Sequence, residues 1–163
     1  MDARKVFEYT HALRNRYLEL FARLPWEEVT KSRGASFDSM RNIFLHMLDA
    51  EDRLVNYIIH GRAKDWTPRK HEEFRDMDSI RKRVQEVESK TKAYLAEITP
   101  AESERIVGYS RIGMPTLPAR VEDVLVHVAL ENIHHFGELI ALLWQIDVEP
   151  PHMGWIPYLQ EAK

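Results

Sequence analysis

The sequence predicts an all-α protein built as a four-helix bundle, and three observations support this fold class. Four long stretches repeat apolar residues at intervals of three and four, the periodicity of amphipathic helices. Almost no stretch alternates apolar and polar residues in the way that is typical of a β-strand. Two connections, residues 62–76 and 99–118, are long enough to cross a bundle. The helical stretches cover about residues 3–24, 36–61, 78–95 and 116–146.

The first two helices are bounded by recognisable start and stop signals. The first is expected from about Ala3 until Pro25 ends it. The second is expected to start near Ser36 or Asp38, because either side chain can cap a helix. It should end at Gly61, a residue suited to the left-handed conformation after a helix.

The second half of the chain predicts two more helices separated by a long connection. The third helix should begin near Asp78, and its dense Lys and Glu content places one side in water. Residues 99–118 contain several Pro and Gly, which predict an extended crossover. The fourth helix should start around residues 116–119, with Pro118 in its first turn, and reach about Ile146.

Composition limits the class of protein. The 163 residues, 44% of them hydrophobic, suit one soluble domain covering residues 1–163. A net charge of -3 gives no general attraction to nucleic acid, and no apolar run is long enough to cross a membrane. The absence of Cys excludes thiol chemistry by the chain itself, and the N-terminus lacks a secretory signal. We therefore expect a cytoplasmic protein with neither a nucleic-acid nor a membrane partner.

The fourth helix carries an unusual cluster of imidazoles and carboxylates. At 100° per residue, His127, Glu131 and His135 lie along one ridge, with His134 and Glu138 beside it. Histidine and carboxylate side chains are ligands for divalent metal ions. The ridge therefore predicts a metal site.

The composition around this cluster favours the metal interpretation. A helix face in water usually mixes Lys and Arg with Glu, yet neither Lys nor Arg occurs between residues 121 and 162. An ordinary amphipathic helix with its polar side in water remains the alternative.

A metal site in a bundle needs a ligand from a facing helix, and the second helix offers His46 beside the apolar residues Ile43 and Met47. A packed or surface histidine is the alternative for His46.

Two motifs together resemble a known family. The first is Ser36-Phe-Asp-Ser-Met-Arg-Asn-Ile-Phe-Leu-His46, followed by Glu51 in a His-x4-Glu arrangement. The second is the block His-x3-[His/Glu]-x2-His-His-x-Gly that begins at His127. Their order and separation resemble the DinB/YfiT-like family, which is regarded as a family of metalloenzymes. The resemblance covers nearly the whole chain.

The resemblance implies an up-down-down-up bundle, often homodimeric, with a divalent metal ion held by three side chains. The family's ligand positions correspond to His46, Glu131 and His135 in this sequence. His127 matches a histidine often present one turn earlier, and Gly137 matches the family glycine.

The sequence departs from the family pattern at two places. The middle ligand is commonly histidine, but here it is Glu131, and the usual His-Arg-Gly-Gln ending reads His-Phe-Gly-Glu up to Glu138. Two histidines and one carboxylate still suit zinc, nickel, iron or manganese. Glu131 could instead mark a lineage that has lost the metal, or His127 or His134 could replace one ligand.

The expected activity follows from the open positions that three protein ligands leave on a metal ion. Relatives include thiol-dependent S-transferases, so the resemblance implies a metal-dependent transferase or hydrolase that acts on a small-molecule substrate, with a low-molecular-weight thiol as cosubstrate. His127, His134 and Glu138 could orient ligands or act as a base. The alternatives are a non-catalytic metal- or small-molecule-binding bundle and a metal-free interaction module.

Two further features have both a structural and a functional interpretation. Gly137 within a helix costs about 1 kcal/mol relative to alanine, which suggests close approach by another helix or a second subunit, or else a tolerated weak point. Trp155 lies in a tail that is expected to pack on the bundle, although it could also cover the mouth of a pocket.

Overall fold

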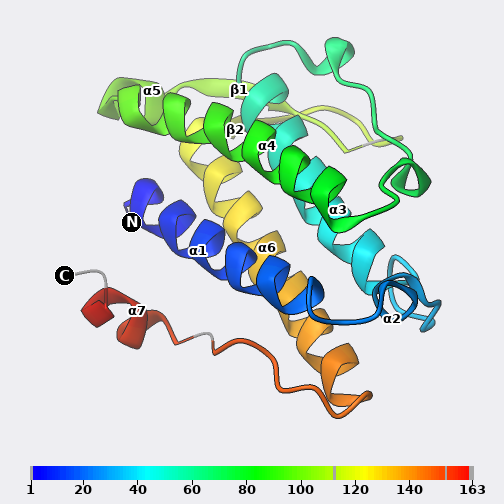
Figure 1. Cartoon of the computed structure of the whole chain (residues 1–163). Coiled ribbons are helices and arrows are strands. Elements are labelled where there is room, and N and C mark those ends of the chain that lie inside the picture. The colour runs from blue at the N-terminus through cyan, green and yellow to red at the C-terminus, as the bar shows by residue number, and fades with distance from the viewer. Residues whose placement is uncertain (1, 112, 153, 162–163) are drawn as a thin grey trace.

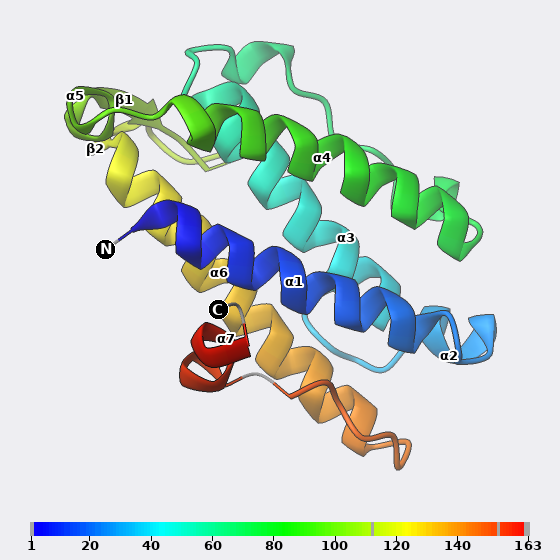
Figure 2. The same ribbon diagram turned by 60° about the vertical axis from the view of Figure 1, so that its left-hand side comes forward.

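Four long helical segments make up most of the chain, as Figure 1 shows. The structure, a computed structural model, describes residues 2–111, 113–152 and 154–161. The long segments are α1 (Ala3–Phe21), α3 (Met40–Glu51) continued by the π-helix η1 (Asp52–Ile58), α4 (Met77–Glu97) and α6 (Val121–Trp144). Helices α1 and α3 each contact both α4 and α6. Helices α1 and α6 run in one direction and α3 and α4 in the opposite direction (Figures 1 and 2).

Short helices and one two-stranded antiparallel sheet, made of β1 (Ile106–Tyr109) and β2 (Leu117–Arg120), lie between and after the long helices. Strands β1 and β2 pair from Ile106 with Arg120 to Tyr109 with Leu117. Within the described residues, no helix is both long and apolar enough to cross a lipid bilayer. The short elements are α2 (Trp26–Thr30), η2 (Ala63–Asp65), η3 (His71–Glu73), α5 (Pro100–Glu104), β1 (Ile106–Tyr109), β2 (Leu117–Arg120) and α7 (Trp155–Glu161).

Helix α3 begins later than its predicted caps. The hydroxyl of Ser39 accepts a hydrogen bond from the Asn42 backbone N–H at 3.2 Å and so caps the helix. The prediction of Ser36 or Asp38 as the cap is wrong. Asp38 has a φ of 74° and forms part of the preceding turn, whereas Ser36 bonds to Glu138 of α6.

The connection before α6 contains more regular structure than predicted. Thr99 caps the short helix α5, and the hairpin β1–β2 follows where only an extended crossover was expected. Pro118 lies in β2 opposite Gly108, so its predicted place in the first turn of α6 is wrong. The helix starts at Val121.

The second predicted helix changes its hydrogen-bond pattern in the middle. After Glu51 the chain forms the π-helix η1, in which the Ile59 N–H bonds to the Leu54 carbonyl at 3.1 Å, five residues earlier. The segment ends at Gly61, which has a φ of 69°, as the stop signal predicted. Turns of π-helix are rare and often occur at functional sites. This one carries Arg53, which lines a cavity of about 540 Å³.

Aromatic and apolar side chains pack between the long helices. The ring of Tyr17 on α1 stacks on Phe136 of α6 with centroids 5.0 Å apart. Phe21 of α1 meets Phe44 of α3 edge-on at 5.7 Å. All four rings are almost completely buried, so these contacts fix α1 against both α3 and α6.

A buried polar network crosses the same core. The guanidinium of Arg14 on α1 bonds to Glu51 at 2.7 Å, to Glu88 at 3.1 Å and to Asn132 at 2.8 Å, which joins all four long helices. His11 lies 2.9 Å from the second oxygen of Glu51. Burial alone would raise the pKa of the Glu51 carboxyl, but Arg14 and His11 hold it well below its usual range. Glu51 of the His-x4-Glu motif therefore belongs to the core.

Candidate metal centre

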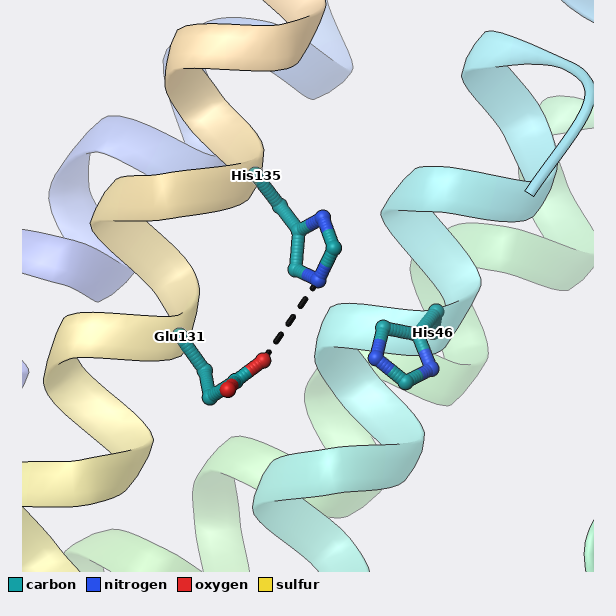
Figure 3. A group of neighbouring side chains, drawn as sticks. All are labelled: His46, Glu131 and His135. Atoms are coloured by element: carbon teal, nitrogen blue, oxygen red, sulfur yellow. Dashed lines mark ion pairs between the residues drawn. The ribbon is translucent and has the colours of Figure 1, made fainter. Parts of the chain in front are cut away.

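Three side chains from two facing helices converge at one point. His46 projects from α3 toward Glu131 and His135, which lie one turn apart on α6 (Figure 3). Each residue offers one ligand atom, and these atoms all lie within 4.8 Å of one another. His135 Nε2 is 3.5 Å from Glu131 Oε2. Two ligands of a tetrahedral zinc ion are about 3.4 Å apart, so small inward side-chain shifts would allow all three atoms to bind one ion.

A hydrogen-bonded carboxylate orients His135. Its Nδ1 lies 3.0 Å from Glu138 Oε2, and Glu138 in turn accepts hydrogen bonds of 2.8 Å from both the backbone N–H and the hydroxyl of Ser36. Burial would raise the pKa of Glu138, but these hydrogen bonds lower it, so the carboxylate stays ionised. An ionised Glu138 favours the proton of His135 on Nδ1 and leaves the lone pair of Nε2 free on the side of Glu131.

His46 is held by aromatic packing. Its ring stacks on Phe37 with centroids 3.8 Å apart and meets His135 edge-on at 4.9 Å. Burial, with the neighbouring His135 as a second cause, lowers the pKa of His46 to about 4. His46 is therefore neutral at neutral pH, the form that binds a metal ion.

The neighbouring histidines occupy different places. His127 Nε2 lies 3.8 Å from Glu131 Oε1 and 3.2 Å from the Tyr109 hydroxyl, at the edge of the centre. His134 is exposed, and its ring contacts His135 at 5.0 Å. Among the described residues, the converging ligand group contains neither His127 nor His134.

A cavity of about 540 Å³ opens beside the centre. His46, Glu131 and His127 form part of its wall. The remaining wall comes from Asp49 and Ala50 of α3, from η1, from the connection that includes Trp66, and from Tyr109 and Arg111. Sequence patterns did not identify Trp66 or Tyr109 as site residues, because loop and hairpin residues are brought to the cavity only by tertiary folding.

The structure distinguishes between the alternative interpretations of Gly137 and Trp155. A Cβ placed on the exposed Gly137 would have no neighbour within 4 Å, so close approach by another helix of the chain is wrong. Trp155 packs edge-on against Tyr9 of α1 at 5.2 Å, as its packing interpretation predicted. It is not among the residues that line the cavity.

Comparison with known proteins extends these observations. The sequence model of the DinB family matches residues 1–162. No curated protein matches the chain. The family match runs through all four long helices and includes the three converging side chains. The chain therefore belongs to the DinB family.

Proposed function

We propose that the protein binds one divalent metal ion through His46, Glu131 and His135. The observation that carries the proposal is the convergence of three ligand atoms from two helices within 4.8 Å at the wall of a cavity. Two imidazoles and one carboxylate suit zinc, nickel, iron or manganese. Glu131 supplies one negative charge, and Glu138 supports His135 from behind.

The proposed activity is a metal-dependent reaction on a small molecule, of the thiol-dependent S-transferase or hydrolase type. His46 and Glu131 both line the cavity, so a ligand there would approach the open side of the centre. The cavity volume of about 540 Å³ lies within the usual range for small-molecule sites. When bound, the ion would supply Lewis acidity to a thiol, water or carbonyl group of the ligand.

We further propose that His127 accepts a proton from a molecule in the cavity. It lines the wall next to Glu131, its side chain is 40% exposed, and the Tyr109 hydroxyl lies 3.2 Å from its Nε2. An imidazole with access to the ligand is a suitable general base. Replacing His127 with Asn should reduce turnover without reducing the metal content.

A non-catalytic binding protein is the second candidate, because a cavity next to a metal ion can also serve only for binding. In the catalytic candidate the metal ion keeps coordination positions at which water or substrate can exchange, whereas in the non-catalytic candidate it does not need them. A metal-free interaction module is the third candidate, and it predicts that purified protein retains no ion.

Elemental analysis of untagged protein purified without chelators tests the metal centre, followed by cobalt substitution. We expect one equivalent of metal and a cobalt absorption spectrum that changes when 2-mercaptoethanol is added. His46→Ala should lose the metal, and His60→Ala, which removes an imidazole away from the centre, should keep it. A spectrum insensitive to thiol and water exchange would favour the non-catalytic candidate. Metal-free protein would refute the proposal.

We also infer that the long helices form an up-down-down-up bundle, which the opposed directions of α1 and α6 relative to α3 and α4 support (Figures 1 and 2). A homodimer and a cytoplasmic location are further proposals. Sedimentation velocity tests the first and cell fractionation the second.

A further inference from the structure

The cavity wall away from the metal centre carries an arginine with no acidic partner. Arg53 is half-buried on η1 and lines the cavity. Its Nη2 donates a hydrogen bond of 3.3 Å to the Ser110 hydroxyl, and its guanidinium lies 5.8 Å from the centre of the Trp66 ring. Across the described parts of the chain, no carboxylate forms an ion pair with Arg53.

Arg83 provides a comparison, because its positive charge is paired with carboxylates. Arg83 is buried but bonds to Asp49 at 3.1 Å and to Asp52 at 2.8 Å. These carboxylates outweigh its burial and raise its pKa. Burial instead lowers the pKa of Arg53, because no carboxylate offsets the loss of water. Arg53 therefore presents an uncompensated positive charge to the cavity.

The cavity is lined by charges of both signs, and Arg53 is the half-buried arginine among them that has no carboxylate partner. Arg69 is already paired with Glu86 at 3.0 Å. Arg111 also lines the cavity and is exposed, so it adds positive charge near the mouth. Three acidic groups line the cavity. Glu131 lies at the metal centre, where it would repel an anion that is not itself bound to the ion. Asp49 is paired with Arg83 at 3.1 Å, and Glu72 is exposed.

The spacing along the helix sets the length of a matching ligand. His46 and Arg53 are seven residues apart on the continuous segment α3–η1, which corresponds to roughly two turns and about 10 Å along the axis. Trp66 and Tyr109 line the same cavity and offer aromatic surface to a hydrocarbon chain.

We propose that the cavity binds a small organic carboxylate in two-ended fashion, with its carboxylate on Arg53 and a donor atom at its other end on the metal centre. The planar guanidinium fork matches a carboxylate in shape and charge. This inference rests on the proposed metal centre and adds the chemical class of the ligand.

Two thiols of equal length test the inference on cobalt-loaded protein. Titrations with 6-mercaptohexanoate and with neutral 6-mercaptohexan-1-ol, followed by cobalt absorption, give the two dissociation constants. We expect the carboxylate to bind about tenfold more tightly, the size expected of one hydrogen bond to a charged group. Arg53→Gln should abolish this preference without changing the affinity for the neutral thiol. Arg53→Lys should keep part of it, and Arg23→Gln, on an exposed residue outside the cavity, should keep all of it.

The possible results distinguish a failure of the proposed carboxylate site from a failure of the proposed metal centre. Equal affinities for the two thiols in the native protein would overturn the carboxylate site while leaving the metal centre intact. Equal weakening of both thiols by Arg53→Gln, in protein that melts like the native form, would also overturn it, since Arg53 would then only shape the cavity. The absence of any cobalt spectrum would overturn the metal centre and the two-ended binding with it.

Discussion

Removing the carboxylate behind His135 should weaken metal binding without removing a ligand. Glu138 lies 3.0 Å from His135 Nδ1 and is itself fixed by two hydrogen bonds from Ser36. In Glu138→Ala, the buried Nδ1–H of His135 loses its acceptor, and the ring loses its preferred tautomer. Loss of such a supporting carboxylate typically lowers metal affinity 10- to 100-fold, or about 1.4–2.8 kcal/mol.

Competition with a chromophoric chelator measures the zinc affinity of each variant. Glu138→Gln keeps an oxygen that accepts from Nδ1 but loses the charge, so we expect a smaller loss than in Glu138→Ala. Glu19→Ala, on an exposed position of α1, is the matched control and should bind zinc like the native protein. Native affinity in Glu138→Ala would refute the reasoning, since it would show that His135 needs no support from this carboxylate.

Three further predictions concern stability. Gly137→Ala should stabilise the protein by about 0.5–1 kcal/mol in urea unfolding, because the added methyl group meets no atom of the chain and improves helix propensity; a loss of stability would instead indicate that a second subunit packs there. Arg14→Met should destabilise the protein by about 3–5 kcal/mol in the same assay, because it leaves the buried carboxylate of Glu51 without its main partner, and a change below 1 kcal/mol would contradict this. The depressed pKa of Glu51 means that its stabilising contribution is present above the unfolded value of 4.5 and is lost as pH falls through the lower folded value. The melting temperatures of native protein and Glu51→Gln should therefore converge as pH falls below 4.5, and a constant difference would argue against this assignment.

Helical periodicity predicted the long elements because their apolar faces are local features of the sequence. It did not predict which residue caps α3, because Ser36, Asp38 and Ser39 are all suitable. The choice depends on a distant contact, the bonds between Ser36 and Glu138 of α6, and on the left-handed turn at Asp38. The π-helix η1 was missed because it preserves the apolar spacing that also fits an α-helix.

The candidate site likewise combines residues that lie close together in the sequence with residues that only the tertiary fold brings together. Glu131 and His135 could be paired from their spacing on one helix. The second helix offered His46 as a facing ligand, with a packed histidine as the alternative, and the family resemblance implied that it joins Glu131 and His135. Neither source predicted Arg53 or Tyr109 as cavity residues. They reach the cavity through a π-helix and a hairpin whose positions depend on the packing of the whole chain.

Anomalous diffraction from crystals loaded with zinc, recorded on both sides of the zinc edge, tests the metal centre most directly. The structure predicts a single strong peak about 2.0–2.2 Å from an imidazole nitrogen of His46, an oxygen of Glu131 and Nε2 of His135. No peak between α3 and α6, or a peak bonded to His127 or His134 in place of these ligands, would contradict the account.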